Sequence, residues 1–412
     1  MSAPVFSYSG MQISYPVNVP MSVSPVNIGD APSPRLRIAT VSGNSNNMDF
    51  PKDGRPNVAT YRFPNSVSAR PDGTLVVIDD SNTVRVISPS GLSTTLAGKY
   101  EVINGVLQTG YADGVGSAAK FNTPLAAAFD PSGNIIVLDT YNFRIRKVTL
   151  AGVVTTLAGS GVSGISDGTG LSAQFKMLTS LWIDNSGNIF VTDGYRVRKI
   201  TPAGVVTTIA GNIVKGNTNG TGTGASFKTM RGITGDNLGN LFVSDTENGS
   251  IRKIDALTVV STVIAGINPT GIAFDSGLLK VSDYILNQII TVMPLSGTYM
   301  VFAGSGVGQF KDGFDTRTGR TAAALYAPEG VAVIVSGPNT ITYVADRNSM
   351  KIRKVDTANY TISAPLPEGL DFDSTTGVIS GIPTKVTPLT TYQVVAANAS
   401  GYTTVTIGFK IT

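Results

Sequence analysis

Cysteine and histidine are both absent from the 412-residue chain, and tryptophan occurs once. Without cysteine there are no disulfides, thiolate metal ligands or cysteine nucleophiles. Without histidine there is no imidazole general base, no Ser-His-Asp triad and no His-ligated metal centre. Because many hydrolases and metalloenzymes depend on these side chains, the sequence predicts a protein that is not an enzyme and has no catalytic residues.

Charged residues are also scarce, at 14% of the chain, whereas an average globular domain has about a quarter. The 31 basic and 27 acidic residues leave a net charge of only +4, and 42% of the residues are hydrophobic. No apolar run approaches the roughly 18 residues of a membrane span. The opening MSAPVFSYSG has neither the basic nor the apolar region of a secretory signal peptide. We therefore expect an ordered protein with no membrane span and no visible signal peptide.

One phrase recurs along the chain. It reads PSGNIIVLDTYNFRIRKVTLAGVVTTLAG from Pro131 to Gly159 and NSGNIFVTDGYRVRKITPAGVVTTIAG from Asn185 to Gly211. The other copies start at Arg70, Asn237, Ser276 and Gly337, and the last stops at Asp356 before any TTLAG. Repetition at such a spacing is typical of propellers and solenoids.

Each copy has the pattern of four short strands. A Pro-led apolar run comes first, a Gly-Asn or Asp-Gly turn follows, and then runs such as I-I-V-L-D, R-I-R-K-V and V-T-T-L-A-G. Short segments rich in β-branched residues and separated by glycine favour strands throughout. Four-strand units repeated about six times are typical of a β-propeller.

The sixth copy lacks its fourth strand, and a matching segment lies far upstream. Residues 37–43 read RIATVSG, which has the V-T-T-L-A-G pattern. A ring closed by one strand from the start of the chain and three from its end leaves no unpaired sheet edge. We therefore predict an all-β fold with a six-bladed β-propeller of four-stranded blades over residues 36–356, closed by strand exchange.

These motifs resemble the NHL-repeat family of propellers. The residues that carry the resemblance are the Gly-Asn-Ile-(Ile/Phe)-Val-x-Asp cores and the Arg-x-Arg-Lys strands, such as Arg144, Arg146 and Lys147. The resemblance covers roughly three quarters of the chain, and copy five departs most, with Gln288-Ile289-Ile290 where the others have basic residues. It implies a six-bladed propeller in a group where some animal members bind RNA and some similar propellers are hydrolases or lyases.

The flanks, residues 1–35 and 357–412, do not carry the repeat. From Pro367, PEGLDFDSTTGVISGIPT resembles the Ig-like modules common in bacterial surface proteins, and the N-terminal PVFSYSGMQISYPVNVP resembles the strands that precede that motif. Either flank alone would leave an apolar sheet face in water, whereas together they approach the roughly 100 residues of such a sandwich. We predict a discontinuous Ig-like β-sandwich, with 1–35 as its N-terminal half and 357–412 as its C-terminal half.

An aspartate ends the second strand of each copy, and the third strand is basic. We interpret the aspartates as turn caps that accept backbone N–H bonds, and we expect the basic residues around the propeller rim. Charges scattered on a rim make a poor phosphate groove, which argues against a nucleic-acid partner. The aspartates assigned this role are Asp80, Asp139, Asp193, Asp245, Asp283 and Asp346.

The loops between repeats are long and Gly-rich, except after Gly266, where only two residues precede Pro269. We expect them to form a crown on one face, with a notch beside copies four and five, and such loops commonly carry binding sites. Their Asp-Gly-x-Gly patterns lack the alternating oxygen ligands of an EF-hand, so we predict no cofactor, with calcium as the alternative. The candidate ligand contacts are Lys99, Tyr100, Tyr111, Arg231, Lys311, Arg317 and Arg320. The aromatic residues expected to wedge between blades are Phe63, Phe121, Phe175, Phe227 and Tyr326.

A propeller combined with an Ig-like module favours a non-enzymatic binding or adhesion protein at the cell surface or outside the cell. The propeller loops would engage a protein or glycan, and the Ig-like domain would act as a spacer or docking unit, alone or in a larger surface assembly. Two alternatives stay open. One is a structural or receptor-binding component of a virion, phage or extracellular appendage, and the other is a propeller hydrolase or lyase, which the absence of histidine disfavours.

Overall fold

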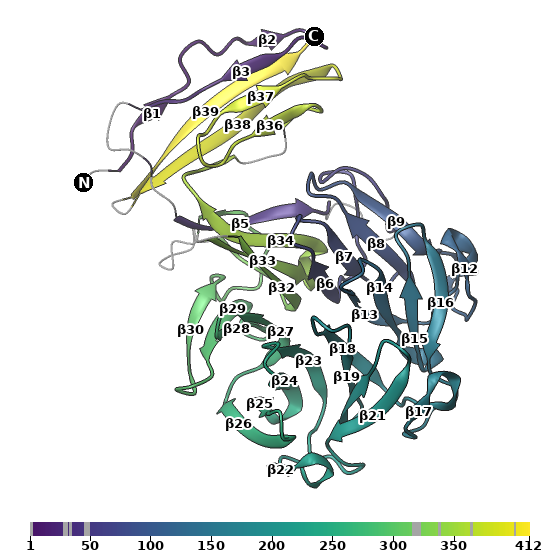
Figure 1. The fold of residues 1–412 in the computed structure, drawn as a ribbon. Helices are drawn as coiled ribbons and strands as arrows, with labels where there is room; N and C mark the ends of the chain where they lie inside the picture. Colours follow the sequence, from purple (N-terminus) through teal and green to yellow (C-terminus); the bar gives the residue numbers. More distant parts are fainter. Residues whose placement is uncertain are drawn as a thin grey trace. The chain divides into compact units, whose positions relative to one another are not determined.

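The structure is a computed structural model that describes residues 3–27, 32, 35–44, 50–314, 323–336, 339–362, 366–398 and 401–412. Apart from short 3-10 turns, the elements in these ranges are β-strands (Figure 1). The chain divides into two compact units. The propeller comprises Thr40–Phe310 and Ala324–Lys354, and the sandwich unit comprises Met1–Ala39, Lys311–Ala323 and Val355–Thr412.

The propeller consists of six antiparallel sheets, or blades, which confirms the predicted fold (Figure 1). Blades one to three are β6 (Ser66–Ala69), β7 (Leu75–Ile78), β8 (Thr83–Ile87) and β9 (Ser93–Gly98); β13 (Pro124–Phe129), β14 (Ile135–Asp139), β15 (Arg144–Val148) and β16 (Val153–Ala158); and β18 (Leu178–Ile183), β19 (Ile189–Asp193), β20 (Arg196–Ile200) and β21 (Val205–Ala210). Blades four and five are β23 (Met230–Gly235), β24 (Leu241–Asp245), β25 (Ser250–Ile254) and β26 (Val259–Ala265); and β27 (Pro269–Asp275), β28 (Leu278–Asp283), β29 (Gln288–Met293) and β30 (Thr298–Ala303).

Blade six closes the ring by strand exchange. It combines β32 (Pro328–Ser336), β33 (Asn339–Asp346) and β34 (Lys351–Ala358) with β5 (Arg35–Ser42), which comes from the N-terminal side of the chain. In its sheet, β5 lies next to β34, in the place of the missing fourth strand. The closure predicted from residues 37–43 is therefore confirmed, and it pairs what would otherwise be an open sheet edge.

The hairpin turns of the blades follow from their sequence. Between β13 and β14, the Asp130 carboxylate accepts the backbone N–H of Asn134 at 2.8 Å, and Gly133 takes a φ of 83°, which glycine adopts without strain. Asp184 accepts from Asn188 in the same way in the next blade. The D-x-x-G-N pattern of the repeat therefore fixes where the first strand of these blades ends and the second begins.

Large apolar side chains fill the spaces between blades. Phe121, Phe175 and Phe227 are at most 2% exposed, as expected for wedges between blades. At the two remaining predicted positions, a residue one or two places earlier in the chain is buried instead. In blade one Tyr61 is buried while Phe63 is 36% exposed, and in blade six Leu325 is buried while Tyr326 is 43% exposed.

The long loops were predicted to form a crown, and the structure shows that each adds an extended segment to the outer edge of the following blade. Four of these segments are strands: β12 (Gly114–Val115) on β16, β17 (Gly168–Thr169) on β21, β22 (Gly220–Thr221) on β26 and β31 (Gly313–Phe314) on β5. In blade one, Gly54 makes an isolated bridge to Ser93. Blade five has the short preceding loop, and its sheet ends at β30.

The sandwich unit joins strands from both ends of the chain, so it is discontinuous. Its sheets are β1 (Phe6–Ser7) with β4 (Val26–Asn27); β2 (Ser14–Tyr15), β39 (Gly401–Ile411), β38 (Thr387–Asn398) and β35 (Tyr360–Ile362); and β3 (Met21–Val23), β37 (Ile379–Gly381) and β36 (Leu370–Phe372). One core contains Phe6, Tyr15 and Met21 together with Tyr392 and Phe409. The N-terminal strands therefore complete a core that the C-terminal strands could not close by themselves.

Candidate ligand-binding site

The middle basic residue of the third strand is buried, not exposed on the rim as the sequence suggested. Arg85, Arg146, Arg198, Arg252 and Arg353 are at most 1% exposed. A buried guanidinium is tolerated only when its donors are satisfied by a paired carboxylate and further acceptors. Because these five charges are unavailable to phosphates, the structure weakens the nucleic-acid interpretation further.

In blades one to four, each of these arginines joins the blade to its preceding loop. In blade two, Arg146 bonds the Asp139 carboxylate at 2.7 Å and the loop residue Asp113 at 2.6 Å. Its guanidinium also lies 5.3 Å from the centre of the Phe121 ring. We call such a buried arginine with its blade aspartate and its loop acceptor an arginine lock. Locks of the same kind are built on Arg85 with Asp79 and Asp53, Arg198 with Asp193 and Asp167, and Arg252 with Asp245 and Asn219.

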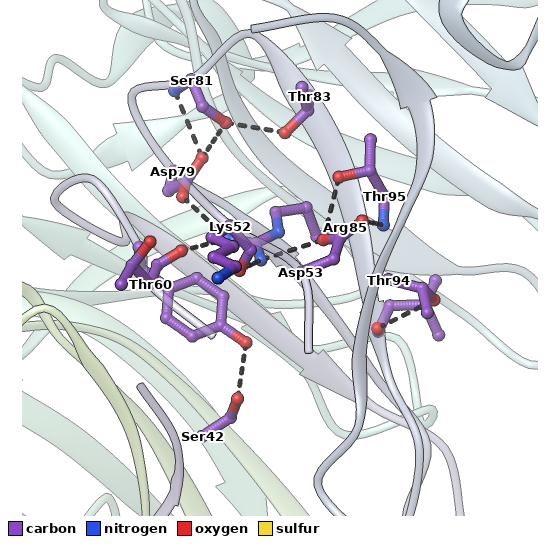
Figure 2. A network of polar contacts seen from close by, with 12 residues as sticks. Ser42, Lys52, Asp53, Thr60, Asp79, Ser81, Thr83, Arg85, Thr94 and Thr95 are labelled. Atoms are coloured by element: carbon purple, nitrogen blue, oxygen red, sulfur yellow. Dashed lines mark hydrogen bonds and ion pairs between the residues drawn. The ribbon is translucent and has the colours of Figure 1, made fainter. Parts of the chain in front are cut away.

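Figure 2 shows the lock of blade one, where Arg85 lies between Asp53 and Asp79. Asp53 also accepts the Thr95 backbone N–H at 2.7 Å, which holds the loop against the outer strand β9. Asp79, not Asp80, therefore occupies the position that Asp139 has in blade two. The sequence assignment of Asp80 was wrong by one residue because two aspartates follow β7.

The blade aspartates act as backbone caps, as the sequence indicated. Asp139 accepts the N–H of Asn122 at 2.8 Å, and Asp193 accepts the N–H of Met177 at 2.8 Å. Burial raises the pKa of Asp139 above its ordinary value, while the Asn122 N–H and the Arg146 guanidinium oppose that shift. These carboxylates hold the loop before each blade and the buried arginine of its third strand together.

A cavity of about 350 Å³ lies on the propeller axis and is lined by the innermost strand of every blade. In five blades one equivalent position lines the cavity and forms a ring: it is the second residue of β13, β18, β23 and β32, and in blade one it is the residue just before β6. The lining members of the ring are Asn65, Leu125, Thr179, Arg231 and Glu329. A concave site of this size with a few polar groups is typical of a small-ligand site.

Arg231 and Glu329 face each other in this ring, with Arg231 Nη1 3.2 Å from Glu329 Oε1. The Arg231 side chain is 49% exposed, whereas that of Glu329 is 15% exposed. Burial raises the pKa of Glu329, and the charges of Arg231 and Arg347 act against that shift. In this pair, Arg231 can donate hydrogen bonds to a ligand in the cavity, and Glu329 can accept one.

The seam between blades six and one contributes a second polar cluster beside the ring. Arg347 Nη2 lies 3.2 Å from Asp80 Oδ2, and Arg347 also bonds the side chain of Asn65. Asn65 Nδ2 in turn donates to Asp80 Oδ1 at 2.7 Å. Asp80 therefore orients a ring residue of blade one next to Arg347 of blade six.

Deeper in the cavity the lining changes from charged to hydroxyl and aromatic. Ser66, Ser68 and Ser180 line it, and Trp182 lies toward the far ends of the strands. In the described part of the chain these three half-buried serine hydroxyls make no hydrogen bond to another protein group. Each can therefore donate to or accept from a ligand in the cavity.

The described residues contain no group of three Asp, Glu, His or Cys side chains placed to hold a metal ion. Within the described ranges, no helix is long and apolar enough to cross a membrane. The cavity itself has one carboxylate, Glu329, among its lining side chains. Its chemistry is that of a polar binding site.

Of the seven predicted contacts, Arg231 lines the cavity. Lys99 pairs with Glu101 at 2.7 Å, Tyr100 accepts a bond from Arg62 at 3.1 Å, and Tyr111 lies 3.8 Å from the Arg144 guanidinium. Lys311 belongs to the sandwich unit. Arg317 and Arg320 lie outside the described residues. The structure therefore does not bring the predicted set together, and those residues stay predictions.

The ring residues other than Arg231 were missed because they lie on strands rather than loops. A signal was present in the sequence, since the residue after the first position of each Pro-led strand is polar in most copies. Thr179, Arg231, Thr270 and Glu329 break apolar runs at this same position. A polar residue repeated at one place in otherwise apolar innermost strands indicates a lined axis.

Two family models match the chain. The family described as "Putative Ig domain" matches residues 323–412, and the family described as "NHL repeat" matches residues 121–148. The solved structure of an auxiliary nutrient binding protein from Bacteroides thetaiotaomicron is similar over 86% of this chain and 98% of its own, with a TM-score of 0.56 and 12% identity. At that identity the likeness shows a shared fold.

Two relatives match most of the chain at low identity. The chain is 26% identical over 343 residues to Protein SUPPRESSOR OF QUENCHING 1, chloroplastic, of Arabidopsis thaliana, covering 74% of this chain and 31% of the relative. It is 27% identical over 371 residues to NHL repeat-containing protein 2 of Gallus gallus, covering 77% and 49%. The chain thus spans half or less of the length of these relatives. The repeats, the closed propeller and the two family matches together show a β-propeller with NHL-type repeats and an Ig-like domain.

Proposed function

We propose that this is a non-enzymatic binding protein whose propeller holds a hydroxyl-rich ligand, a glycan, at the axial cavity. The observation that carries the proposal is the lining itself, which combines a partly exposed guanidinium, one carboxylate and free serine hydroxyls in about 350 Å³. A glycan presents donors and acceptors in similar number, so it can satisfy Arg231, Glu329 and Ser180 together. The nutrient-binding propeller of B. thetaiotaomicron supports a binding role through its fold alone.

We also propose that the site has no catalytic activity. Hydrolysis of a glycosidic bond by the usual route needs two carboxyl groups about 5–9.5 Å apart, and Glu329 is the one carboxylate among the described residues that line the cavity. The chain contains no histidine to replace it. Incubation of a bound glycan with the protein, followed by mass spectrometry, should recover the glycan intact, and cleavage products would contradict the proposal.

The cell surface or the extracellular space is the proposed location, with the Ig-like domain as a spacer or docking unit. The match to the Ig family supports this proposal. Labelling of intact source cells with an antibody against the propeller should give a surface signal. A signal confined to permeabilised cells would contradict it, and a signal on released particles would favour the alternative of a virion or appendage component.

The binding proposal is tested by a glycan array probed with three proteins. Wild type should bind a defined set of glycans, and Arg231→Ala should weaken that binding at least about tenfold because a charged hydrogen-bond donor is lost. Lys147→Ala is the matched control, since it removes the same charge from a side chain that is 41% exposed on β15. Binding that is absent in wild type, or unchanged in Arg231→Ala, would overturn the proposal.

A further inference from the structure

The outer edge of blade five differs from that of every other blade. The other five blades have a loop segment paired to this edge, through β12, β17, β22, β31 or the Gly54–Ser93 bridge. Nothing in the described part of the chain pairs with the outer edge of β30. An edge strand with free N–H and C=O groups is a template for pairing with another strand.

Three sequence changes act together to open this edge. The preceding loop is reduced to Ile267 and Asn268, so there is no segment to cover β30. Ile290 takes the register position of the lock arginine, since it pairs with Val301 as Arg146 pairs with Thr156. Val301 in turn replaces the threonine that binds the loop aspartate, as Thr156 binds Asp113 at 3.1 Å.

The result is an apolar edge where the sister blades have a covered one. Tyr299 occupies the register position of Val154, which pairs with Gly114 of β12. Val154 is 1% exposed, whereas Tyr299 is 45% and Met300 is 55% exposed. Leu295, in the turn before β30, is fully exposed. Exposed apolar side chains on an open edge strand favour association with another strand.

The charge pattern indicates which strand fits. No charged residue occurs from Tyr284 to Phe310, although 14% of the chain is charged. Natural proteins often protect edge strands with lysine or other charges, and this edge has none. In a two-fold antiparallel pair of short strands, a residue near the axis lies opposite or close to its own copy, so a charged residue there would repel its counterpart. An uncharged apolar edge is therefore suited to pairing with an identical edge.

We propose that β30 is the interface of a homodimer, in which two copies of the chain pair antiparallel through this strand to form a continuous sheet. The two-fold contact covers both open edges at once and leaves no further edge to extend into a fibre. The proposal is independent of glycan binding, because the cavity is lined by the innermost strands and β30 is the outermost strand of its blade (Figure 1).

Sedimentation equilibrium of the full chain tests the interface. Wild type should be a dimer, and both Met300→Lys and Tyr299→Lys should weaken dimerisation at least about tenfold, because each places like charges across the two-fold axis. Leu238→Lys is the matched control, since Leu238 is 82% exposed in the turn between β23 and β24. It should remain dimeric.

Hydrogen exchange supplies a second readout that a folding defect would not mimic. The amides of residues 298–302 should exchange more slowly as the wild-type concentration rises, and this dependence should be lost in Met300→Lys. A monomeric wild type, or lysine variants that dimerise as wild type does, would overturn the proposal. Protection gained only on adding a different protein would also overturn it and would assign the edge to that protein. Loss of glycan binding with an intact dimer would leave the interface standing.

Discussion

Blades two and five have the same four strands but stabilise their outer regions in different ways. Blade two buries Arg146 between Asp139 and Asp113 and covers its edge with β12. Blade five has Ile290 at the arginine position, a two-residue loop and an uncovered β30. The arginine, the loop acceptor and the outer threonine are present together or absent together. This comparison indicates that the second arginine of the Arg-x-Arg-Lys strand has a structural role. It binds the loop that precedes its blade to the blade.

Replacing the lock arginine should reduce the free energy of unfolding more than any other change considered. Arg146→Met leaves Asp139 buried without its counter-charge, which costs about 3–5 kcal/mol in the free energy of unfolding. Urea unfolding followed by fluorescence measures this, because the one tryptophan, Trp182, lies in β18 and reports on the propeller. Lys147→Met, next along the strand and 41% exposed, should change that free energy by at most about 0.5 kcal/mol. Equal effects of the two variants would contradict the assignment of the lock.

Removing only the loop acceptor should have a smaller effect. Asp113→Ala takes one charged bond from Arg146 but leaves Asp139 in place, and Asp113 itself is 45% exposed. We expect a loss of about 1–2 kcal/mol, reduced from a fully buried charged bond by solvent screening. The same denaturation assay, together with faster hydrogen exchange of β12 and of the outer half of β16, checks it. A stability loss without faster exchange there would mean that the aspartate does not hold the loop.

The repeat was sufficient to predict the architecture because the residues that specify each turn and strand lie close together in sequence and recur in six copies. Turns such as the one with Asp130 and Gly133 carry their own Asp and Gly, and the closing strand carries the repeat motif. Burial of the lock arginines could not be predicted in that way. A strand sequence such as R-I-R-K-V does not specify that a loop aspartate about thirty residues upstream, Asp113 for Arg146, returns to pair with it.

The binding cavity was missed for a related reason. Its ring combines one residue from each of several distant blades, such as Asn65, Arg231 and Glu329, and only the closed ring brings them to the same axis. Arg231 was named from its proximity to a loop, although it lies on β23. Because the prediction considered loops, it identified Arg231 alone among the residues of the innermost strands that line the cavity.

The smallest expected effect on stability concerns Lys280, a buried cation in blade five, which has no arginine lock. Lys280 is 6% exposed on β28, with its ammonium 3.7 Å from the Asp275 carboxylate and 2.9 Å from the Thr291 hydroxyl. Burial lowers the pKa of Lys280 below its ordinary 10.5, and Asp275 opposes that shift. Unlike the arginine of a lock, this group can lose its proton in the alkaline range.

The pH dependence of stability should distinguish the two kinds of blade. Between the lowered pKa and 10.5, the unfolded chain binds a proton at Lys280 that the folded chain does not, so stability rises with pH across that window. The double variant Lys280→Met/Asp275→Asn removes this rise of stability with pH. At neutral pH its free energy of unfolding should differ from that of wild type by at most about 1 kcal/mol, because a buried pair is replaced by neutral groups of similar size. Urea unfolding at neutral and alkaline pH should show wild type gaining on the variant as pH rises. A constant difference would mean that the Lys280 ammonium keeps its proton in both states, and that blade five holds its cation as firmly as blade two.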